Sequence, residues 1–355
     1  MLSIDKADYS VQVVRSFDFC GDDYFELFER SRAYAFQHPN WLDAFYRHMA
    51  PGRGAEPFVL SIRLAADGML HCVLPLILRR KAGLRLLETT DLGVSDYACP
   101  VALPEFWPEL ERNKVLQSQI LKALPRHDLL RIRPVREEDC GHFRLLLGCE
   151  PKPLDFFAHA VELGQPYADW RKTAFNGSLR KMIDRKKRKL LREHEGVVLE
   201  RLTETGAVSA AIAELARLRA GRFNGDVIDQ EFALRFYQDV AQEGAREGLA
   251  ETWRLTADGG LRGVVFGLTH EGRFYYLLIG CDYDNSGQYS PGLQLYDGIM
   301  EQQARKRDAS FDFTIGDEDF KLKFGTVATP MHVFIKAGSI LGVAAKRILE
   351  SRLGT

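Results

Sequence analysis

The run Tyr289-Ser-Pro-Gly-Leu293 carries the clearest chemical signal in this chain, because it joins an apolar segment to the start of a predicted helix. Residues 273–282 are mostly apolar and of strand length, Pro291 suits a first helical turn, and Gly292 lets backbone amides approach a ligand closely. Open N–H groups and the positive end of a helix dipole favour an anion. The run therefore predicts a site for the pyrophosphate of a nucleotide-like cofactor, with an ordinary strand-to-helix turn as the alternative.

Three acidic residues near this run are candidates for a general base or an amine-binding anion. Asp282 ends the apolar segment, Asp312 alternates with two phenylalanines on a predicted strand, and Asp317 follows Gly316. The alternation points Asp312 away from the aromatic rings and toward a cleft, so Asp312 is the preferred base. The alternative is structural, because an acid at a strand end often caps the next helix, as Asp317 would.

Length and composition bound the class of protein. The 355 residues can bury a large core, and 46% hydrophobic with 27% charged residues are typical of a globular chain of two domains. The formal net charge of -1 gives no overall attraction to nucleic acid or membrane. Six cysteines without CxxC pairs and the lack of a basic, apolar leader predict a reducing cytosol. No apolar stretch reaches the roughly 20 residues of a spanning helix, and 339–345 is predicted to start an amphipathic closing helix.

The predicted elements follow one order twice. In the first half, strands are predicted at 11–16, 58–64, 70–79, 84–92 and 129–134, and helices at 22–33, 40–49 and 105–124. In the second half, strands are predicted at 197–202, 249–256, 261–270, 273–282, 310–315 and 329–337, and helices at 208–222, 230–246, 291–307 and 317–323. A strand or linker at 156–163 leads to Gly164-Gln-Pro166, the predicted boundary between a domain of residues 1–165 and one of residues 166–355. The repeated order predicts duplication with divergence.

A set of motifs makes this order more specific. They are Phe36-Gln-His-Pro-Asn-Trp41, Leu74-Pro-Leu76, Ser95-Asp-Tyr97, the basic helix after Asn176, Tyr289-Ser-Pro-Gly292, and the segment from Phe311 to Gly325. With its three-strand meander and glycine loop, the second half resembles the GCN5-related N-acetyltransferase (GNAT) fold. Over roughly residues 11–336 the chain resembles the CelD-type acyltransferases associated with bacterial cellulose biosynthesis, which are similar to the FemAB peptidoglycan aminoacyltransferases. The resemblance implies an α/β (α+β) fold of tandem GNAT-like domains, each a mixed, mainly antiparallel sheet flanked by helices, with the N-terminal domain degenerate.

The resemblance also implies a donor site. In GNAT proteins the thioester of acyl-CoA lies where two strands part, here 275–282 and 311–316, and backbone amides polarise its carbonyl. The implied contacts are Leu278, Ile279 and Gly280 on the strand, and Tyr289, Ser290, Pro291, Gly292 and Leu293 at the helix start. The co-substrate would be acetyl-CoA or a longer acyl-CoA, with no metal. One departure is that 285–292 carries no basic residue, so phosphate affinity would depend on amides, Ser290 and cations from elsewhere.

The acceptor side is implied less directly. The loop around Asp96 and Tyr97 lacks a Ser-Pro-Gly helix start, so the N-terminal half is expected to have lost cofactor binding and to shape the acceptor pocket, with Trp41. Arg222 would face the same cleft. Lys321 or Lys323 would bind phosphate or carboxylate, as in a similar FemAB motif. The alternatives are interdomain packing for Trp41, a turn for Asp96, a surface role for Arg222 and a solvated lysine for Lys321 or Lys323.

Residues 180–192 contain eight basic side chains against one acid, Asp184. Leu179, Ile183 and Leu190, with Met182 and Leu191, recur at helical spacing, which predicts a helix with one docked stripe and a cationic remainder. Such a surface would attract CoA phosphates, an acyl carrier protein, an anionic lipid-linked sugar or an anionic membrane surface, and an ordinary solvated face is the alternative. Nucleic acid is disfavoured because no aromatic residues are interleaved.

Other chemistries lack their motifs. The sequence contains no HExxH, GxGxxG or GxxxxGK[ST], its nine histidines are dispersed, and Gly93-Val-Ser-Asp-Tyr97 only half matches GxSxG. Following the resemblance, we expect a cytoplasmic enzyme, at most peripheral to the inner membrane. It would move an acyl group, acetyl first, from acyl-CoA to an amine or hydroxyl of a small-molecule or lipid-linked sugar, a cell-envelope or exopolysaccharide precursor. An aminoacyl-tRNA-dependent FemAB-like transferase and a non-catalytic scaffold subunit of an envelope-polysaccharide system are the alternatives.

Overall fold

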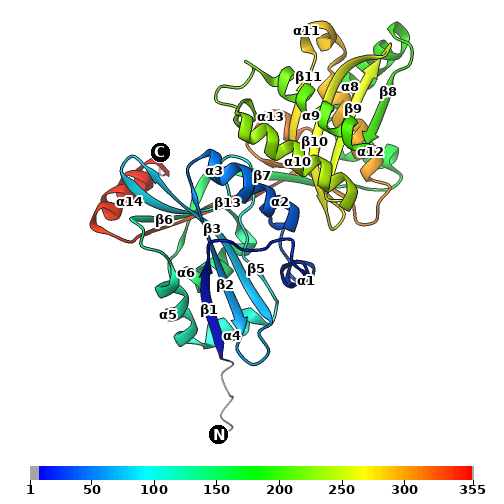
Figure 1. The fold of residues 1–355 in the computed structure, drawn as a ribbon. Helices are drawn as coiled ribbons and strands as arrows, with labels where there is room; N and C mark the ends of the chain where they lie inside the picture. The colour runs from blue at the N-terminus through cyan, green and yellow to red at the C-terminus, as the bar shows by residue number, and fades with distance from the viewer. Residues whose placement is uncertain (1–7, 354–355) are drawn as a thin grey trace. The chain divides into compact units, whose positions relative to one another are not determined.

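The computed structural model describes residues 8–353, which divide into two units (Figure 1). The second unit is Phe156–Thr329, and the first contains the described residues on either side of it in the sequence. This division differs from the predicted domains 1–165 and 166–355. Residues from Pro330 onward join the first unit because β13 (Val327–Ala337) hydrogen-bonds antiparallel to β6 (Leu129–Arg136), so the strand predicted to close the C-terminal domain belongs elsewhere.

In the first unit, hydrogen-bonded strands follow the order β1-β2-β3-β4-β6-β13, and β5 pairs with β3. The remaining strands are β1 (Tyr9–Val14), β2 (Glu56–Leu64), β3 (Leu70–Lys81), β4 (Leu84–Thr89) and β5 (Val101–Ala102). The helices are α1 (Asp22–Arg30), η1 (Ala35–Gln37), α2 (Pro39–Ala44), η2 (Phe45–Met49), α3 (Ala50–Gly52), α4 (Phe106–Arg112), α5 (Lys114–Ala123), η3 (Glu137–Asp139), α6 (Cys140–Leu147) and α14 (Ile340–Leu353). Apolar side chains of α4, α5 and α6 form a core with β2, β3 and β6.

In the second unit, strands follow the order β7-β12-β11-β10-β9-β8. They are β7 (Pro151–Glu162), β8 (Val198–Leu202), β9 (Ala250–Ala257), β10 (Gly260–His270), β11 (Arg273–Cys281) and β12 (Ser310–Ile315). The helices are α7 (Tyr167–Ala174), α8 (Gly177–Glu193), α9 (Thr205–Arg219), η4 (Val227–Asp229), α10 (Glu231–Glu247), α11 (Tyr283–Ser286), η5 (Gly287–Tyr289), α12 (Pro291–Gln303) and α13 (Asp319–Leu322). Helices α9 and α10 pack on one face of these strands, and α8 and α12 pack on the other (Figure 1). The predicted fold class, a mixed and mainly antiparallel sheet flanked by helices, is confirmed.

Tight turns fix the register of the two strand meanders. Residues Ala82-Gly83, Asp258-Gly259 and Glu271-Gly272 each have positive φ at both positions. Two-residue turns of this kind match the right-handed twist of antiparallel strands, and glycine adopts the second position without strain. They join β3 to β4, β9 to β10 and β10 to β11, which places the last strand of each meander beside the strand that follows it after a helix.

Each unit contains one parallel strand pair that separates after a short ladder. In the first unit, β4 pairs with β6 from Leu86 opposite Leu129 to Glu88 opposite Arg131. In the second unit, β11 pairs with β12 from Arg273 opposite Ser310 to Tyr275 opposite Asp312. A threonine hydroxyl bridges each point of separation, since Thr89 Oγ1 donates to the Arg133 carbonyl (2.8 Å) and Thr314 Oγ1 donates to the Tyr276 carbonyl (3.2 Å). Beyond these bridges each pair leaves an opening.

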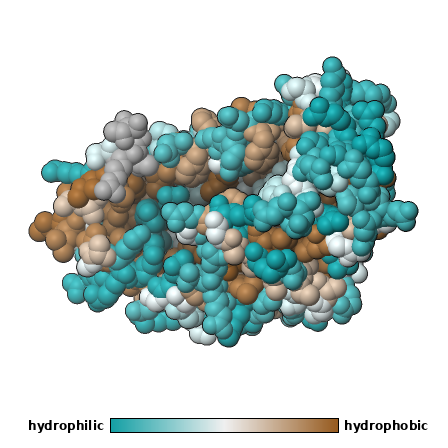
Figure 2. Space-filling view, turned by 90° about the horizontal axis from the view of Figure 1, so that it is seen from above, coloured by the Kyte–Doolittle hydropathy of each residue, from teal (hydrophilic) through white to brown (hydrophobic). Residues whose placement is uncertain are grey.

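Helix α14 presents an apolar surface to solvent, which forms the brown area at the left edge of Figure 2. The exposed large apolar side chains of α14 include Ile340, Leu341, Val343 and Ile348. On the side facing the sheet, Leu349 packs near Leu86, Leu129 and Ile335. Of the helices within residues 8–353, none has the length and hydropathy needed to cross a bilayer.

Asp128 fastens the start of α14 to β4. Its buried carboxylate accepts hydrogen bonds from the Arg85 N–H (2.8 Å), the Arg85 guanidinium and the Ser339 hydroxyl (2.8 Å). These donors, first the Arg85 backbone N–H, hold the pKa of Asp128 well below its usual range. A depressed pKa means that the ionised carboxylate stabilises the folded state.

We expect Asp128→Asn to lower the thermal midpoint at pH 7, and the difference from the parent protein to shrink on acidification. The contribution is complete above the unfolded pKa of about 3.9 and is lost as pH falls from there toward the lower folded pKa. Thermal unfolding followed by circular dichroism between pH 7 and pH 3 measures this. Asp155→Asn, at an exposed position of β7, is the control, and an acid-independent difference for Asp128→Asn would contradict the assignment.

Candidate functional site

The open edge of β11 forms one wall of the candidate site. On its other edge β11 pairs with β10, where Leu278, Ile279 and Gly280 lie opposite Phe266, Val265 and Val264. The register skips Leu277, which forms a β-bulge just past the ladder with β12. The Ile279 carbonyl accepts a hydrogen bond from Arg219 (3.0 Å). The residues predicted to contact a thioester therefore do lie where the parallel ladder has ended.

The start of α12 lies beside this edge, and the predicted helix start at Pro291 is confirmed. Ser290 has a left-handed backbone (φ 51°), and its N–H donates to the Gly287 carbonyl. Leu293 N–H donates back to the Ser290 carbonyl (3.0 Å). The N–H of Gly292 has no acceptor within the described chain, and Pro291 has no N–H, so this helix start offers fewer open amides than the sequence predicted.

A cavity of about 270 Å³ opens at this helix start. Tyr283, Ser290, Gly292, Leu293, Tyr296 and Phe320 line it, together with Gly287. A Cβ added at Gly292 would lie 3.0 Å from the Tyr283 hydroxyl, so glycine keeps the cavity open. Burial raises the pKa of Tyr283 and of Tyr296, so both phenols stay protonated at neutral pH and can donate hydrogen bonds. The volume suits part of a larger ligand, such as a thiol arm or a phosphate.

Basic side chains from α8 and from the turn after α9 supply the cations that the loop itself lacks. On α8, Lys186 Nζ donates to the Gln288 carbonyl, and Lys189 Nζ donates to the Gln288 side chain (2.6 Å). Arg222, predicted to bind substrate, donates to Asp284 (3.1 Å) and lies over the Tyr283 ring (5.2 Å). Three cations therefore lie next to residues 283–290, a segment that contains no basic residue of its own.

Helix α8 packs as predicted along one stripe. Leu179, Ile183 and Leu190 are buried, whereas Leu191 is exposed. The cationic remainder includes Lys181, Arg185, Lys187, Arg188 and Arg192, all exposed. The surface field around this helix is consequently positive.

Asp312, the preferred base, has no solvent-exposed surface. Its carboxylate pairs with Arg273 (3.2 Å) and accepts the Thr314 N–H (2.8 Å). These contacts hold β12 at the point where it leaves β11. The geometry favours a structural role for Asp312 over proton transfer to a substrate.

Asp317 follows the carboxyl end of β12. Ligands of open parallel sheets bind at this end of the strands. Its side chain is 42% exposed, and its Oδ1 accepts hydrogen bonds from the Phe157 N–H (3.3 Å) and His159 Nε2 (2.8 Å). His159 is buried on β7. Asp282 instead caps α11 by accepting the Asn285 N–H (3.2 Å). Of the three predicted acids, Asp317 is the one whose carboxylate is both oriented by His159 and accessible from solvent.

Lys321 and Lys323, the two lysines predicted to bind phosphate or carboxylate, differ in burial. Lys321 is 2% exposed, and its ammonium donates to the carbonyls of Ile315 (2.7 Å) and Gly316 (2.9 Å) and pairs with Glu318 (2.9 Å). All three of its N–H donors are used, so the prediction of anion binding fits Lys321 poorly. Lys323, two residues later, is exposed.

The three predicted contacts from the first unit lie largely inside it. Trp41 is fully buried, with its indole N–H donating to the Ser95 hydroxyl (3.0 Å). Tyr97 is also buried, beneath the Arg136 guanidinium (4.8 Å from the ring centre). Asp96 is half-buried. The packing of Trp41 and Tyr97 within the first unit favours a structural role for both, which for Trp41 differs from the predicted alternative of interdomain packing, and substrate binding by Asp96 stays a prediction.

Sequence reasoning missed His159, Tyr283, Tyr296 and Phe320. Tyr296 could have been inferred, because it lies four residues after Gly292 on the same helix face. His159 had no local signal, since it reaches Asp317 across 158 positions of sequence.

Comparison with known proteins agrees with this geometry. Residues 177–322 match the family model described as "Acetyltransferase (GNAT) domain". FemX has a similar structure, with a TM-score of 0.60 and 13% identity over 90% of this chain and 96% of that one. The L-PGS of Bacillus licheniformis gives a TM-score of 0.54 and 12% identity over 94% and 96% of the two chains. A Bacteroides thetaiotaomicron protein of unknown function gives 0.53 and 10% over 91% and 99%.

These likenesses differ in what they establish. The family match shows that residues 177–322 form a GNAT acyltransferase-type domain, as the resemblance predicted for the second half. At 10–13% identity the structural likenesses show the fold alone, over nearly the whole chain. No curated protein matches the sequence significantly. The narrower CelD-like assignment stays a prediction.

We expect Lys321→Met to lower the free energy of unfolding by about 1–3 kcal/mol, because two carbonyls beside a buried ammonium lose their donor. Lys323→Met is the matched control, and its effect should stay within about 0.5 kcal/mol because the side chain is exposed. Chemical denaturation of both variants measures the difference. Equal effects would show that the Lys321 contacts contribute nothing to stability.

Proposed function

We propose that the second unit transfers an acyl group from acyl-CoA, acetyl first, to an amine or hydroxyl. The observation that carries this proposal is the opening between β11 and β12 beside the cavity at Gly292. A strand with a free edge and a bulge can donate backbone N–H groups to a ligand carbonyl, and a helix start can hold a phosphate. Bound acyl-CoA supplies an activated thioester at this edge. Membership of the segment in a GNAT-type domain supports the same donor.

The residues around the cavity then have distinct roles. Gly292 contributes an open N–H, and Lys186, Lys189 and Arg222 supply positive charge around the 283–290 loop. The protonated phenols of Tyr283 and Tyr296 line the cavity. Asp317, oriented by His159, takes the proton of the attacking amine or hydroxyl.

For the acceptor, we propose a sugar or cell-envelope precursor, following the resemblance to CelD-type acyltransferases. The cationic surface of α8 would attract an anionic acceptor, an acyl carrier protein or an anionic membrane surface. A cytoplasmic enzyme that works at the inner face of a membrane fits this surface.

We expect CoA and acetyl-CoA to bind the parent protein with 1:1 stoichiometry in isothermal titration calorimetry, and Gly292→Val to weaken both at least tenfold. The added side chain would press on Tyr283 and fill the cavity. Gly141→Val is the matched control, because Gly141 also occupies the second position of a helix, α6, with no atom near its missing Cβ. Failure of the folded parent protein to bind CoA at high micromolar concentration would remove the donor assignment.

We expect Asp317→Asn to lower kcat by about 10²–10⁴-fold with an unchanged melting temperature, because it removes a general base. Asp312→Asn should instead lower the free energy of unfolding by about 1–3 kcal/mol, because its carboxylate is buried against Arg273. Asp282→Asn is the control for a capping acid. Steady-state kinetics and thermal unfolding of the three variants separate these roles, and full activity of Asp317→Asn would exclude it as the base.

A second candidate is aminoacyl transfer from an aminoacyl-tRNA, which the exposed cations of α8 favour. Binding of RNA to such a surface would weaken steeply with salt. Acyl transfer that proceeds with acyl-CoA alone and survives nuclease treatment would exclude this candidate.

A further inference from the structure

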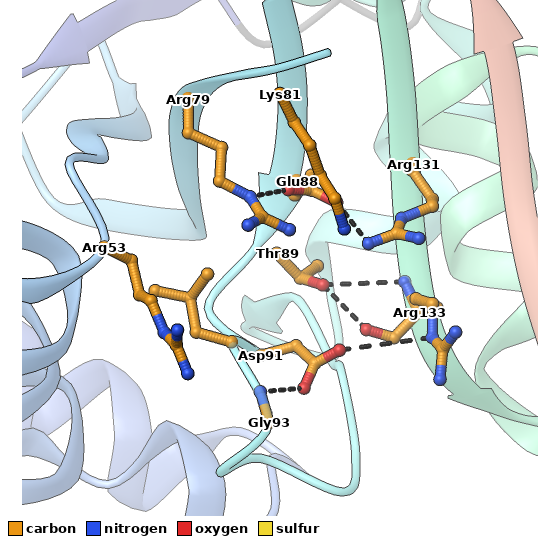
Figure 3. Close-up of a pocket in the computed structure, with 10 residues that line it drawn as sticks. Arg53, Arg79, Lys81, Glu88, Thr89, Asp91, Gly93, Arg131 and Arg133 are labelled. Carbon is orange, nitrogen blue, oxygen red and sulfur yellow. Dashed lines mark hydrogen bonds and ion pairs between the residues drawn. The ribbon is translucent and has the colours of Figure 1, made fainter. Parts of the chain in front are cut away.

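A cationic cavity of about 330 Å³ lies in the first unit (Figure 3). Its basic side chains are Arg53, Arg79, Lys81, Arg131 and Arg133. Arg79 and Lys81 share one face of β3, and Arg131 and Arg133 lie two residues apart on β6, because side chains alternate along a strand. Arg53 comes from the end of α3. Figure 3 shows these side chains converging from three segments of the first unit.

The cavity holds more positive than negative charge. Glu88 and Asp91 face the five basic side chains, which leaves an excess of three positive charges. Glu88 is 4% exposed and accepts hydrogen bonds from both Arg79 and Arg131. Asp91 lies 4.0 Å from Arg133. The two carboxylates hold the guanidinium groups in place without neutralising the site.

This excess is local, because the whole chain has a formal net charge of -1. Like charges gathered around a small cavity repel one another, and an entering anion relieves that repulsion. Within residues 8–353, Lys81 forms no ion pair with an acidic side chain. The Nε of Arg131 is buried and has no hydrogen-bond acceptor among the same residues. The cavity therefore presents donors for which the protein supplies no oxygen.

The position of the cavity also favours a ligand. It lies where β4 and β6 separate after Glu88 and Arg131, beside the Thr89 bridge. The second unit opens at the corresponding point, between β11 and β12. In the first unit that opening is lined by cations instead of aromatic side chains.

We propose that the first unit binds a ligand by its phosphate or diphosphate group in this cavity. Guanidinium forks bind phosphate oxygens bidentately, and the Lys81 ammonium adds a mobile point charge. Leu92 is the one apolar side chain in the described lining, so the part of the ligand that enters is polar. The volume corresponds to about eleven water molecules at roughly 30 Å³ each, which is enough for a diphosphate. The proposal is independent of the donor site, because the whole lining belongs to the first unit.

Calorimetry of the full chain with inorganic pyrophosphate at constant ionic strength tests this proposal. We expect saturable binding, weaker binding of inorganic phosphate, and at least a tenfold loss of pyrophosphate affinity in Lys81→Gln and in Arg133→Gln. Lys81→Gln keeps the test decisive if Arg133→Gln fails to fold, because Lys81 is exposed. Arg80→Gln is the matched control, since it removes the same charge from the opposite face of the same strand, outside the lining.

Pyrophosphate would also fit the helix start in the second unit, so Gly292→Val is included. Binding that depends on Lys81 should persist in Gly292→Val, and CoA binding should persist in Lys81→Gln. The proposal is overturned if pyrophosphate does not bind, if Arg80→Gln weakens binding as much as Lys81→Gln does, or if citrate binds as tightly as pyrophosphate. The last result would assign the cavity to anions in general.

Discussion

Two pairs of parallel strands separate in this molecule, and the need of the backbone for hydrogen bonds governs the structure at both openings. A buried N–H or carbonyl must find a partner, so a ladder that ends early needs side chains, water or a ligand to complete it. Here each ladder spans three residue pairs. In both units a threonine hydroxyl donates to a strand carbonyl just past the ladder, and Arg219 donates to the Ile279 carbonyl of β11. Past these bridges neither parallel ladder continues.

The two openings share a backbone plan and differ in chemistry. Between β11 and β12 the nearby cavity is lined by tyrosines, a phenylalanine and the start of α12. Between β4 and β6 the lining is almost entirely charged. The two units share a strand order, whereas the side chains at their openings differ. A common fold therefore does not imply a common ligand, and each opening must be interpreted from its own residues.

The sequence predicted what depends on local pattern. Apolar patterns of strand length and the proline at the start of α12 identified the strands of the meanders and the helix that follows them, and helical spacing identified the buried stripe of α8. It could not show that β13 pairs with β6, since those strands lie about two hundred positions apart. Nor could it distinguish Lys321 from Lys323, which differ only in which way the chain turns them. The cationic cavity was missed because its residues come from separate segments that only the tertiary fold brings together.

The membership of β13 in the first unit has a consequence for synthesis on the ribosome. Strand β6 emerges early, but its neighbour in the ladder is translated only after all of Phe156–Thr329. During that interval the nascent chain carries an unpaired strand edge, which is prone to wrong pairing. The second unit can therefore form all of its strand pairs before the first unit does. The unit that begins first on the ribosome is the last to complete its sheet.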